Sequence, residues 1–357
     1  HRGRKVVDLW GGIADAEQQT PWQEDTLVPV FSVSKGIVAT CVLHLSMNNG
    51  FDYDQPITEY WPEFDGPGKT ELTARDIMNH RSGLVGISQD LTLDQLDEWT
   101  PARKALEEQS PFWTPGTQQG YHAVSYGLYV RELFERMAEE RLGGYLAREI
   151  SDPLGASVYL GLPDTETHRV ARLYRPLTRQ RLAAIPGILT GGSNEGRVAR
   201  ALLSKNSYTY RAFAHPAALG FKSGDNFNTT RVHQMELPWC NVVATARGLA
   251  KVYDQLAREG GDLIDSEVLA PVYQRQSWQE MDNVLRKPMG FSQGFVKEET
   301  RLFSPNVESF GHPGMGGALG WADPVARLSI GYVMNRMDGH VRSPRALALC
   351  HAAYSAL

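Results

Sequence analysis

The chain has 357 residues, 42% apolar and 22% charged, so it can bury a substantial core and should form one large or two ordinary domains. Its 41 acidic and 36 basic residues give a net charge of -5. This balance lacks the basic surplus that draws proteins to phosphate backbones, so nucleic acid is not an expected partner. The three cysteines are isolated and odd in number, which indicates neither a disulfide framework nor a zinc site.

The chain shows no membrane-spanning stretch. Its longest apolar run, Ile37 to Met47, contains His44 and is far shorter than the roughly 20 residues that a spanning helix needs. No apolar signal region follows His1, so no targeting segment can be read. We therefore expect a cytoplasmic protein without a membrane span; an export signal upstream and the oligomeric state stay open.

The first part of the chain predicts a strand, a short extended segment and a long helix. Lys5 to Gly12 has the pattern of an apolar strand that ends in Gly-Gly. Leu27 to Phe31 has the pattern of a short extended segment that leads into the helix. From Ser32 to Asn48 apolar residues recur at helical spacing, and Asn49-Gly50 ends the pattern.

From Tyr53 to about Pro238 the sequence predicts short helices separated by loops rich in proline and glycine. The last third then predicts a helix over Ala244 to Gly260 and another over Arg342 to Ser355. Between them four strands are expected: Gly290 to Lys297, Glu308 to Gly311, Gly317 to Asp323 and Leu328 to Asn335. Strands at both ends around a helical middle predict an α/β domain built from both ends of the chain, with a helical domain inserted.

Three common functional motifs are missing from the chain. The segment Gly191 to Glu195 lacks the second glycine of the GxSxG elbow, and HExxH does not occur. In Gly314 to Gly320, Leu319 stands where a dinucleotide loop needs its third glycine. A conventional α/β-hydrolase, a metal site and a nicotinamide cofactor are thus disfavoured.

The segment Ser32-Val33-Ser34-Lys35 opens the first predicted helix. Ser32 and Lys35 lie on one face because they are three residues apart. The positive end of the helix stabilises an alkoxide and favours the neutral amine, so Lys35 could take the proton of Ser32. The alternative is that Ser32 only caps the helix and that Lys35 is a solvated surface residue.

Two further segments could complete such a site. The loop Pro115 to Ala123 presents Tyr121, whose phenol could relay a proton between the lysine and the serine; alternatively it is a buried tyrosine bonded to backbone. The glycine-rich segment Gly311 to Gly317 could let an acyl group approach the backbone and supply an N–H for an oxyanion. Taken alone, it could also be a tight turn.

Together these segments resemble the serine β-lactamase and penicillin-binding-protein superfamily, and more closely its class C-like esterases, the family VIII carboxylesterases. The resemblance spans nearly the whole chain. It includes Ser32 to Lys35, Tyr53 to Ile57, Tyr60 to Phe64, Thr73 to Leu84, Pro115-Gly116 before Tyr121, Leu237-Pro238 with Asn241, and Gly311 to Gly314 through Asp323-Pro324. It implies a β-lactamase/transpeptidase-like α/β fold, with a central antiparallel sheet flanked by helices and an inserted, mainly helical domain.

The resemblance also implies roles for particular residues. The nucleophile corresponds to Ser32, the general base to Lys35 and the tyrosine of the Tyr-x-Asn motif to Tyr121. The Lys-Thr-Gly strand corresponds to His312-Pro313-Gly314, so the oxyanion N–H groups would come from Met315 and Ser32.

Two positions depart from the lactamase pattern. Ala123 replaces the asparagine that meets the drug's acylamino group, and His312 replaces the lysine that attracts its carboxylate. We expect His312 to be partly protonated near neutral pH and to retain a weak attraction for carboxylates. Acyl transfer to Ser32 needs neither of the replaced side chains.

The sequence therefore predicts a carboxylesterase that cleaves short-chain acyl esters through an acyl-serine, with a small-molecule ester as its partner and with no metal or organic cofactor. A class C-like β-lactamase, a D-amino-acid peptidase and an idle peptidoglycan- or protein-binding relative are the alternatives. Residues 1–60 and 240–357 are expected to form the α/β domain and residues 61–239 the helical domain, with the active site between them. Six aromatic residues could line the pocket, although core is the more frequent fate: Trp99, Trp113, Phe213, Phe221, Phe227 and Trp239.

Overall fold

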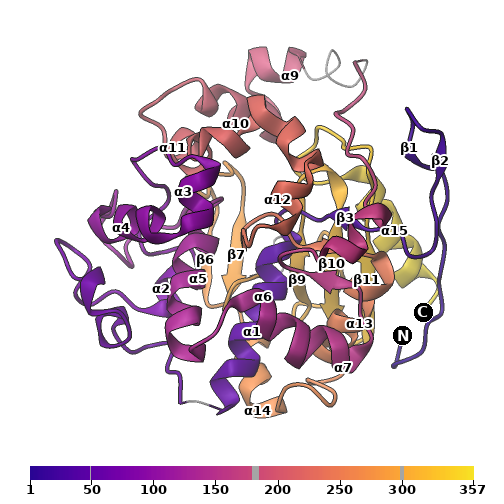
Figure 1. Cartoon of the computed structure of the whole chain (residues 1–357), viewed down its shortest axis with the longest axis horizontal. Helices are drawn as coiled ribbons and strands as arrows, with labels where there is room; N and C mark the ends of the chain where they lie inside the picture. The colour runs from indigo at the N-terminus through magenta and orange to yellow at the C-terminus, as the bar shows by residue number, and fades with distance from the viewer. Residues whose placement is uncertain (49, 179–184, 298–300) are drawn as a thin grey trace.

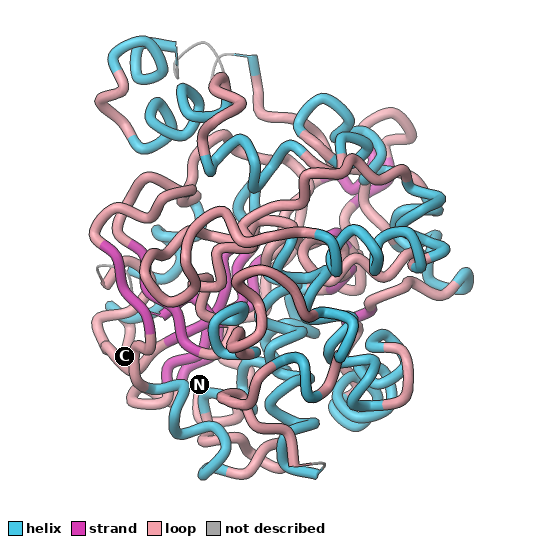
Figure 2. Tube along the Cα trace, turned by 90° about the vertical axis from the view of Figure 1, so that its left-hand side faces the viewer, coloured by secondary structure: helices cyan, strands magenta, loops and turns pink. Residues whose placement is uncertain are grey.

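The computed structural model describes residues 1–48, 50–178, 185–297 and 301–357. At its centre is a six-stranded antiparallel sheet with the order β11-β10-β9-β8-β7-β6 (Figure 1). Its strands are β6 (Ser277–Gln279), β7 (Met289–Ser292), β8 (Phe295–Lys297), β9 (Phe310–Pro313), β10 (Leu319–Asp323) and β11 (Leu328–Tyr332). Figure 2 shows these strands surrounded by helices. The expected α/β fold with a central antiparallel sheet flanked by helices is confirmed.

Helices cover both faces of this sheet. Those that pack on it include α1 (Val33–Asn48), α13 (Ala246–Ala257) and α15 (Pro344–Ser355). Within β10, Leu319 and Trp321 share a core with Cys350 of α15, whereas Ala322 belongs to the core that contains α1 and α13. Because side chains alternate along a strand, one strand serves two cores.

Helix α1 is buried on nearly all sides. Every side chain from Val33 to Leu43 is buried, as expected for a helix that is apolar all round. Its polar members have internal partners, since Thr40 donates to the Gly36 carbonyl (2.9 Å) and the Ser34 hydroxyl accepts from the Val242 N–H (3.0 Å). The helix expected from Ser32 is confirmed from Val33 onward, and the expected stop at Asn49 lies outside the described residues.

The middle of the chain is mainly helical, as predicted. Its helices are η1 (Ile57–Glu59), η2 (Pro62–Phe64), α2 (Ala74–Met78), α3 (Leu93–Glu98), α4 (Thr100–Glu108), α5 (Ser125–Ala138), α6 (Leu142–Tyr145), η3 (Leu146–Ser151), α7 (Asp152–Leu154), η4 (Asp164–Arg169), α9 (Ile185–Thr190), α10 (Asn194–Leu202), α11 (Tyr208–Ala214), η5 (Ala217–Leu219), η6 (Phe221–Asn228) and α12 (Thr230–Gln234). The last third adds α14 (Ser266–Leu269), η7 (Ala270–Tyr273) and η8 (Met315–Gly317). The division into residues 1–60 with 240–357 and residues 61–239 stays a prediction.

The N-terminal part differs from the prediction. The segment from Lys5 to Gly12 is not a strand; Val6, Val7 and Leu9 are exposed. Asp8 is held by ion pairs with Lys5 and Arg247 rather than by a backbone ladder. The two strands that follow it form a separate hairpin, β1 (Ile13–Asp15) with β2 (Thr20–Pro21). The six-stranded sheet is thus built from the last third of the chain and not from both ends.

A small second sheet joins distant parts of the chain. It has the order β3-β5-β4, with β3 (Val28–Pro29), β5 (Val243–Ala244) and β4 (Val158–Tyr159). The strand β3 leads directly into the segment that carries Ser32, so this sheet fixes the approach to α1.

The single strand expected over Gly290 to Lys297 is two strands joined by a tight turn. Gln293 (φ +45°) and Gly294 (φ +92°) both adopt positive φ, the conformation of a two-residue hairpin turn. A Cβ on Gly294 would lie 2.3 Å from the Tyr126 hydroxyl, so this turn packs against α5. Within the described residues, no helix has the length and apolar character needed to cross a membrane.

Candidate active site

Ser32 and Lys35 meet at the start of α1. Ser32 directly precedes the helix and is half-buried in the wall of a large cavity, whereas Lys35 is fully buried behind it. The Nζ of Lys35 lies 3.5 Å from the Ser32 Oγ. These two predicted site residues are therefore in contact in the structure. The alternative interpretation, in which Lys35 is a solvated surface residue, is wrong.

The Lys35 amine is held by backbone carbonyls rather than by a carboxylate. Its Nζ donates to the Ala123 oxygen (2.8 Å) and the Trp239 oxygen (3.1 Å). Burial lowers the pKa of Lys35 to about 7, because removing the ammonium from water disfavours its charged form. A substantial fraction of Lys35 is then neutral at neutral pH and can accept a proton.

Tyr121 completes this group. Its buried ring lies 5.0 Å from the Lys35 Nζ and stacks on Phe291 (centroids 6.2 Å apart, 13° between planes), and Ser32 is among the groups that influence the pKa of its hydroxyl. Burial raises the pKa of Tyr121 although the contact with Ser32 lowers it. The phenol is consequently neutral at physiological pH, which suits a proton relay better than a phenolate base.

Asp282 fixes the backbone of Tyr121 and is a residue that the sequence analysis missed. This carboxylate is fully buried and accepts hydrogen bonds from the N–H groups of Tyr121 (3.1 Å), Val284 (2.9 Å) and Leu285 (2.9 Å). The side chain of Gln119 donates to its other oxygen (3.3 Å). Burial raises the pKa of Asp282, while these donors oppose the rise.

Two buried histidines, His80 and His122, hold the loop that carries Tyr121. The His122 N–H donates to the Nδ1 of His80 (3.1 Å), so the proton of neutral His80 resides on Nε2. His122 bonds the Gly120 carbonyl through Nδ1 and Ser82 through Nε2, both at 2.6 Å. Burial lowers the pKa of His122 to about 4 and that of His80 well below its ordinary value. Both rings are therefore neutral structural partners of the loop.

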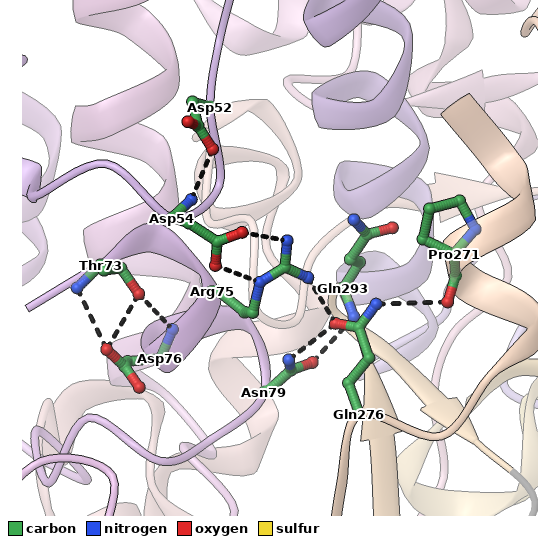
Figure 3. Close-up of polar contacts among 9 residues, drawn as sticks. All are labelled: Asp52, Asp54, Thr73, Arg75, Asp76, Asn79, Pro271, Gln276 and Gln293. Atoms are coloured by element: carbon green, nitrogen blue, oxygen red, sulfur yellow. Dashed lines mark hydrogen bonds and ion pairs between the residues drawn. The ribbon is translucent and has the colours of Figure 1, made fainter. Parts of the chain in front are cut away.

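Polar contacts tie the segment that carries His80 to the sheet (Figure 3). The Gln276 side-chain oxygen accepts from Arg75 (2.8 Å) and Asn79 (2.9 Å), and the Gln293 N–H donates to the Asn79 side chain (2.8 Å). Arg75 also forms a two-pronged ion pair with Asp54. These contacts hold α2 against β6 and the turn between β7 and β8, so the supports of Tyr121 are fixed relative to the sheet.

The strand β9 places His312 next to the ring of Tyr121. The two ring centroids are 6.0 Å apart, and His312 is buried in the cavity wall with its Nδ1 bonded to the Pro313 carbonyl (2.8 Å). Burial, together with the charge of Lys35, lowers the pKa of His312 well below its ordinary value. The expectation that His312 is partly protonated near neutral pH is therefore wrong, because that expectation ignored burial.

Gly314 and Met315 follow at the end of β9. A Cβ on Gly314 would lie 2.3 Å from the Val30 carbonyl, so only glycine lets this strand end approach the segment before Ser32. The Gly314 N–H is already bonded to the Ala318 carbonyl (2.7 Å). Met315 begins η8 and lines the cavity with Gly314 and His312. The use of its N–H as an oxyanion donor stays a prediction.

The cavity has a volume of about 550 Å³, and both Ser32 and Tyr121 line it. Phe213, Phe227 and Trp239 lie in its wall, so for these three the pocket interpretation is correct. Trp99 and Trp113 instead pack into the cores, and the side chain of Phe221 lies outside the described part of the structure. Among the described residues, no three His, Cys, Asp or Glu side chains are grouped so that they could hold a metal ion.

Comparisons with known proteins show to which family the chain belongs. Residues 1–353 match the family model described as Beta-lactamase. The chain is 31% identical over 345 residues to the Esterase/beta-lactamase LipL of Mycobacterium tuberculosis, covering 94% of this chain and 75% of that protein.

Solved structures give the same result. A family VIII carboxylesterase superposes with a TM-score of 0.86 at 34% identity, covering 100% of this chain and 90% of the other. EstA from Arthrobacter nitroguajacolicus Rue61a superposes with a TM-score of 0.81 at 31% identity, covering 99% and 89%. The chain therefore belongs to the beta-lactamase family, within which it resembles the family VIII carboxylesterases.

Proposed function

We propose that this protein hydrolyses carboxylic esters through an acyl intermediate on Ser32. The observation that carries the proposal is the contact between the Ser32 hydroxyl and a buried lysine whose pKa is lowered to about 7. A serine becomes a useful nucleophile when an adjacent neutral base can take its proton. Similarity to proteins named as esterases supports an ester as the substrate.

In the proposed reaction neutral Lys35 removes the Ser32 proton, with the Tyr121 phenol relaying it. The Ser32 Oγ attacks the ester carbonyl, and the tetrahedral intermediate collapses as the alcohol leaves with the proton that Lys35 and Tyr121 return. The same two residues then deprotonate a water molecule, which attacks the acyl-serine. The carboxylic acid is released, and Ser32 regains its proton.

The oxyanion of the tetrahedral intermediate is proposed to bind the backbone N–H groups of Ser32 and Met315. The position of Met315 in the cavity wall supports this role, as does the engagement of the neighbouring Gly314 N–H with Ala318. Fixed donors of this kind stabilise charge as it develops and typically contribute a few kcal/mol to the barrier. The preference for a short acyl chain, inferred from the missing drug-binding groups, belongs to this proposal.

Cleavage of β-lactams is the second candidate activity. The name of LipL and the guanidinium of Arg342, whose charge lowers the pKa of both Tyr121 and His312, favour it. A neutral His312 and the absence of an amide at Ala123 disfavour it. A D-amino-acid peptidase faces the same two replacements, and the assembled Ser32, Lys35 and Tyr121 argue against an idle binding protein.

The test compares the purified wild type with Ser32→Ala and Ser34→Ala on 4-nitrophenyl acetate and butyrate. Ser34 is the matched control, because it lies in the same motif but its hydroxyl bonds to Val242. We expect Ser32→Ala to abolish turnover and Ser34→Ala to retain it at a modest cost in stability, about 1 kcal/mol. Equal turnover by Ser32→Ala and the wild type would refute the proposal.

A further inference from the structure

The cavity beside Ser32 is much larger than a short acyl group requires. Pockets of about 300–1,000 Å³ enclose most of the surface of a drug-sized ligand, and this one measures about 550 Å³. An acetyl or butyryl group on Ser32 would leave most of this space to water.

The wall facing this space is largely apolar. Helix α10 presents Val198, Ala199 and Leu202 to the cavity, three positions that form one stripe at helical spacing. Phe227 packs edge-to-face on Phe31 (centroids 5.0 Å apart) and forms another part of the wall. Water against such a surface is displaced favourably by an apolar group.

Carboxylates in the wall are already bound to protein partners. Asp225 pairs with Arg175 (3.2 Å), and Glu195 accepts a hydrogen bond from the Val341 N–H (3.1 Å). They therefore do not call for a cationic substrate, and the part of the wall formed by α10 and Phe227 offers apolar burial.

We propose that the ester carries a bulky apolar group, about six to twelve carbons in its acyl or alcohol part, which packs against the stripe Val198, Ala199 and Leu202. The inference rests on the proposed esterase function and extends it from the reaction to the size of the substrate. A short acyl chain is compatible with it when the alcohol supplies the apolar bulk.

Two ester series distinguish the sources of the apolar group. In the first, the acyl chain of 4-nitrophenyl esters grows from acetyl to decanoyl; in the second, acetate esters of ethanol, hexanol and decanol, whose leaving groups are equally basic, are followed by pH-stat titration. We expect kcat/KM to rise in at least one series, by roughly two- to fourfold per methylene over the first several carbons. A flat or falling kcat/KM in both series overturns the proposal, while turnover of the acetates leaves the esterase function intact.

A matched pair of variants tests the position of the apolar site. Val198→Trp fills the cavity from α10, whereas Arg200, an exposed residue, points the opposite way from the same helix and gives the control Arg200→Trp. In the preferred series, Val198→Trp should lower the ratio of kcat/KM for the largest ester to that for the smallest at least about tenfold, and Arg200→Trp should not. An unchanged ratio in Val198→Trp overturns the proposal.

Binding to Ser32→Ala keeps the inference testable should Val198→Trp fail to fold. Calorimetry should show, in at least one of the two ester series, at least about tenfold tighter binding of the largest ester than of the smallest. Equal affinities within both series overturn the proposal. Selective binding of the larger esters by this variant, combined with a wild type that cleaves no ester, would uphold the apolar site and refute the esterase function.

Discussion

The carboxylate of Asp282 accepts a hydrogen bond from the backbone N–H of Tyr121 (3.1 Å), across 161 positions of sequence. The same side chain also binds the N–H groups of Val284 and Leu285, so the connection between β6 and β7 holds the carboxylate in place. The phenol beside Ser32 is thus positioned by the sheet as well as by its own loop.

Replacement of Asp282 should damage the reaction through the position of Tyr121. Asp282→Ala leaves three N–H groups without this acceptor, so we expect a loss of at least about 2 kcal/mol in the free energy of unfolding. A misplaced phenol should also lower kcat at least about tenfold with a small change in KM.

Asp282→Asn is the matched control, because an amide oxygen can still accept from the Tyr121 N–H. It should recover most of the lost kcat. If both variants turn over ester like the wild type, the contact with Asp282 has no role in placing Tyr121.

Lys35 and Tyr121 should behave as one unit with Ser32. Lys35→Ala and Tyr121→Phe should each lower kcat strongly, and the double variant should lose much less than the product of the two effects, because both residues serve one proton path. Steady-state kinetics of the three variants measures this. Multiplicative losses would show that the two residues act independently.

The pH dependence of kcat/KM should reflect the amine of Lys35. The reaction needs the neutral amine, and burial lowers the pKa of Lys35 to about 7, so activity should fall about tenfold per pH unit below that value. His80, His122 and His312 cannot cause this fall in activity below pH 7, because burial lowers the pKa of all three imidazoles.

An ester whose leaving group does not ionise between pH 5 and 9 separates enzyme from substrate titration. A single limb with a pKa near 10 would mean that Lys35 retains the ordinary pKa of an amine and is not tuned as a base. If kcat/KM did not change with pH, the titration of Lys35 would have no part in the rate-determining step.

Esters should be cleaved much faster than β-lactams. His312 is buried and neutral, and Ala123 offers only its backbone oxygen, which Lys35 already occupies. We expect kcat/KM for a short-chain nitrophenyl ester to exceed that for nitrocefin at least about a hundredfold, roughly 2.7 kcal/mol in the barrier.

The variant with His312→Lys and Ala123→Asn restores both side chains of the lactamase pattern and should narrow this ratio. If the wild type cleaved nitrocefin with the same kcat/KM as its best ester, β-lactam hydrolysis would replace ester hydrolysis as the proposed main activity.

The sequence predicted those parts of the site whose residues lie close together on one helix. Ser32 and Lys35 could be paired in advance because a helix places positions three apart on one face. The turn at Gln293 and Gly294 was missed, since a glycine within an apolar run does not reveal positive φ at two consecutive residues. Asp282 and His80 were missed because they act through contacts between distant segments.

Protonation could not be predicted from residue type. Typical pKa values would leave His312 partly charged and Lys35 fully charged at neutral pH. For Lys35, only its place at the start of a helix indicated that the neutral amine is favoured. Burial lowers both pKa values, so His312 is neutral and Lys35 is poised near pH 7. The depth of each side chain, which depends on the whole fold, decides the chemistry.

Mass spectrometry of a trapped intermediate tests the acyl-serine account most directly. The wild type is mixed with a slowly hydrolysed ester, quenched in acid and digested, and each peptide is examined for the mass of the acyl group. The account predicts one acylated residue, Ser32, and no adduct in Ser32→Ala. An adduct on another residue, or none while the ester is being turned over, would contradict it.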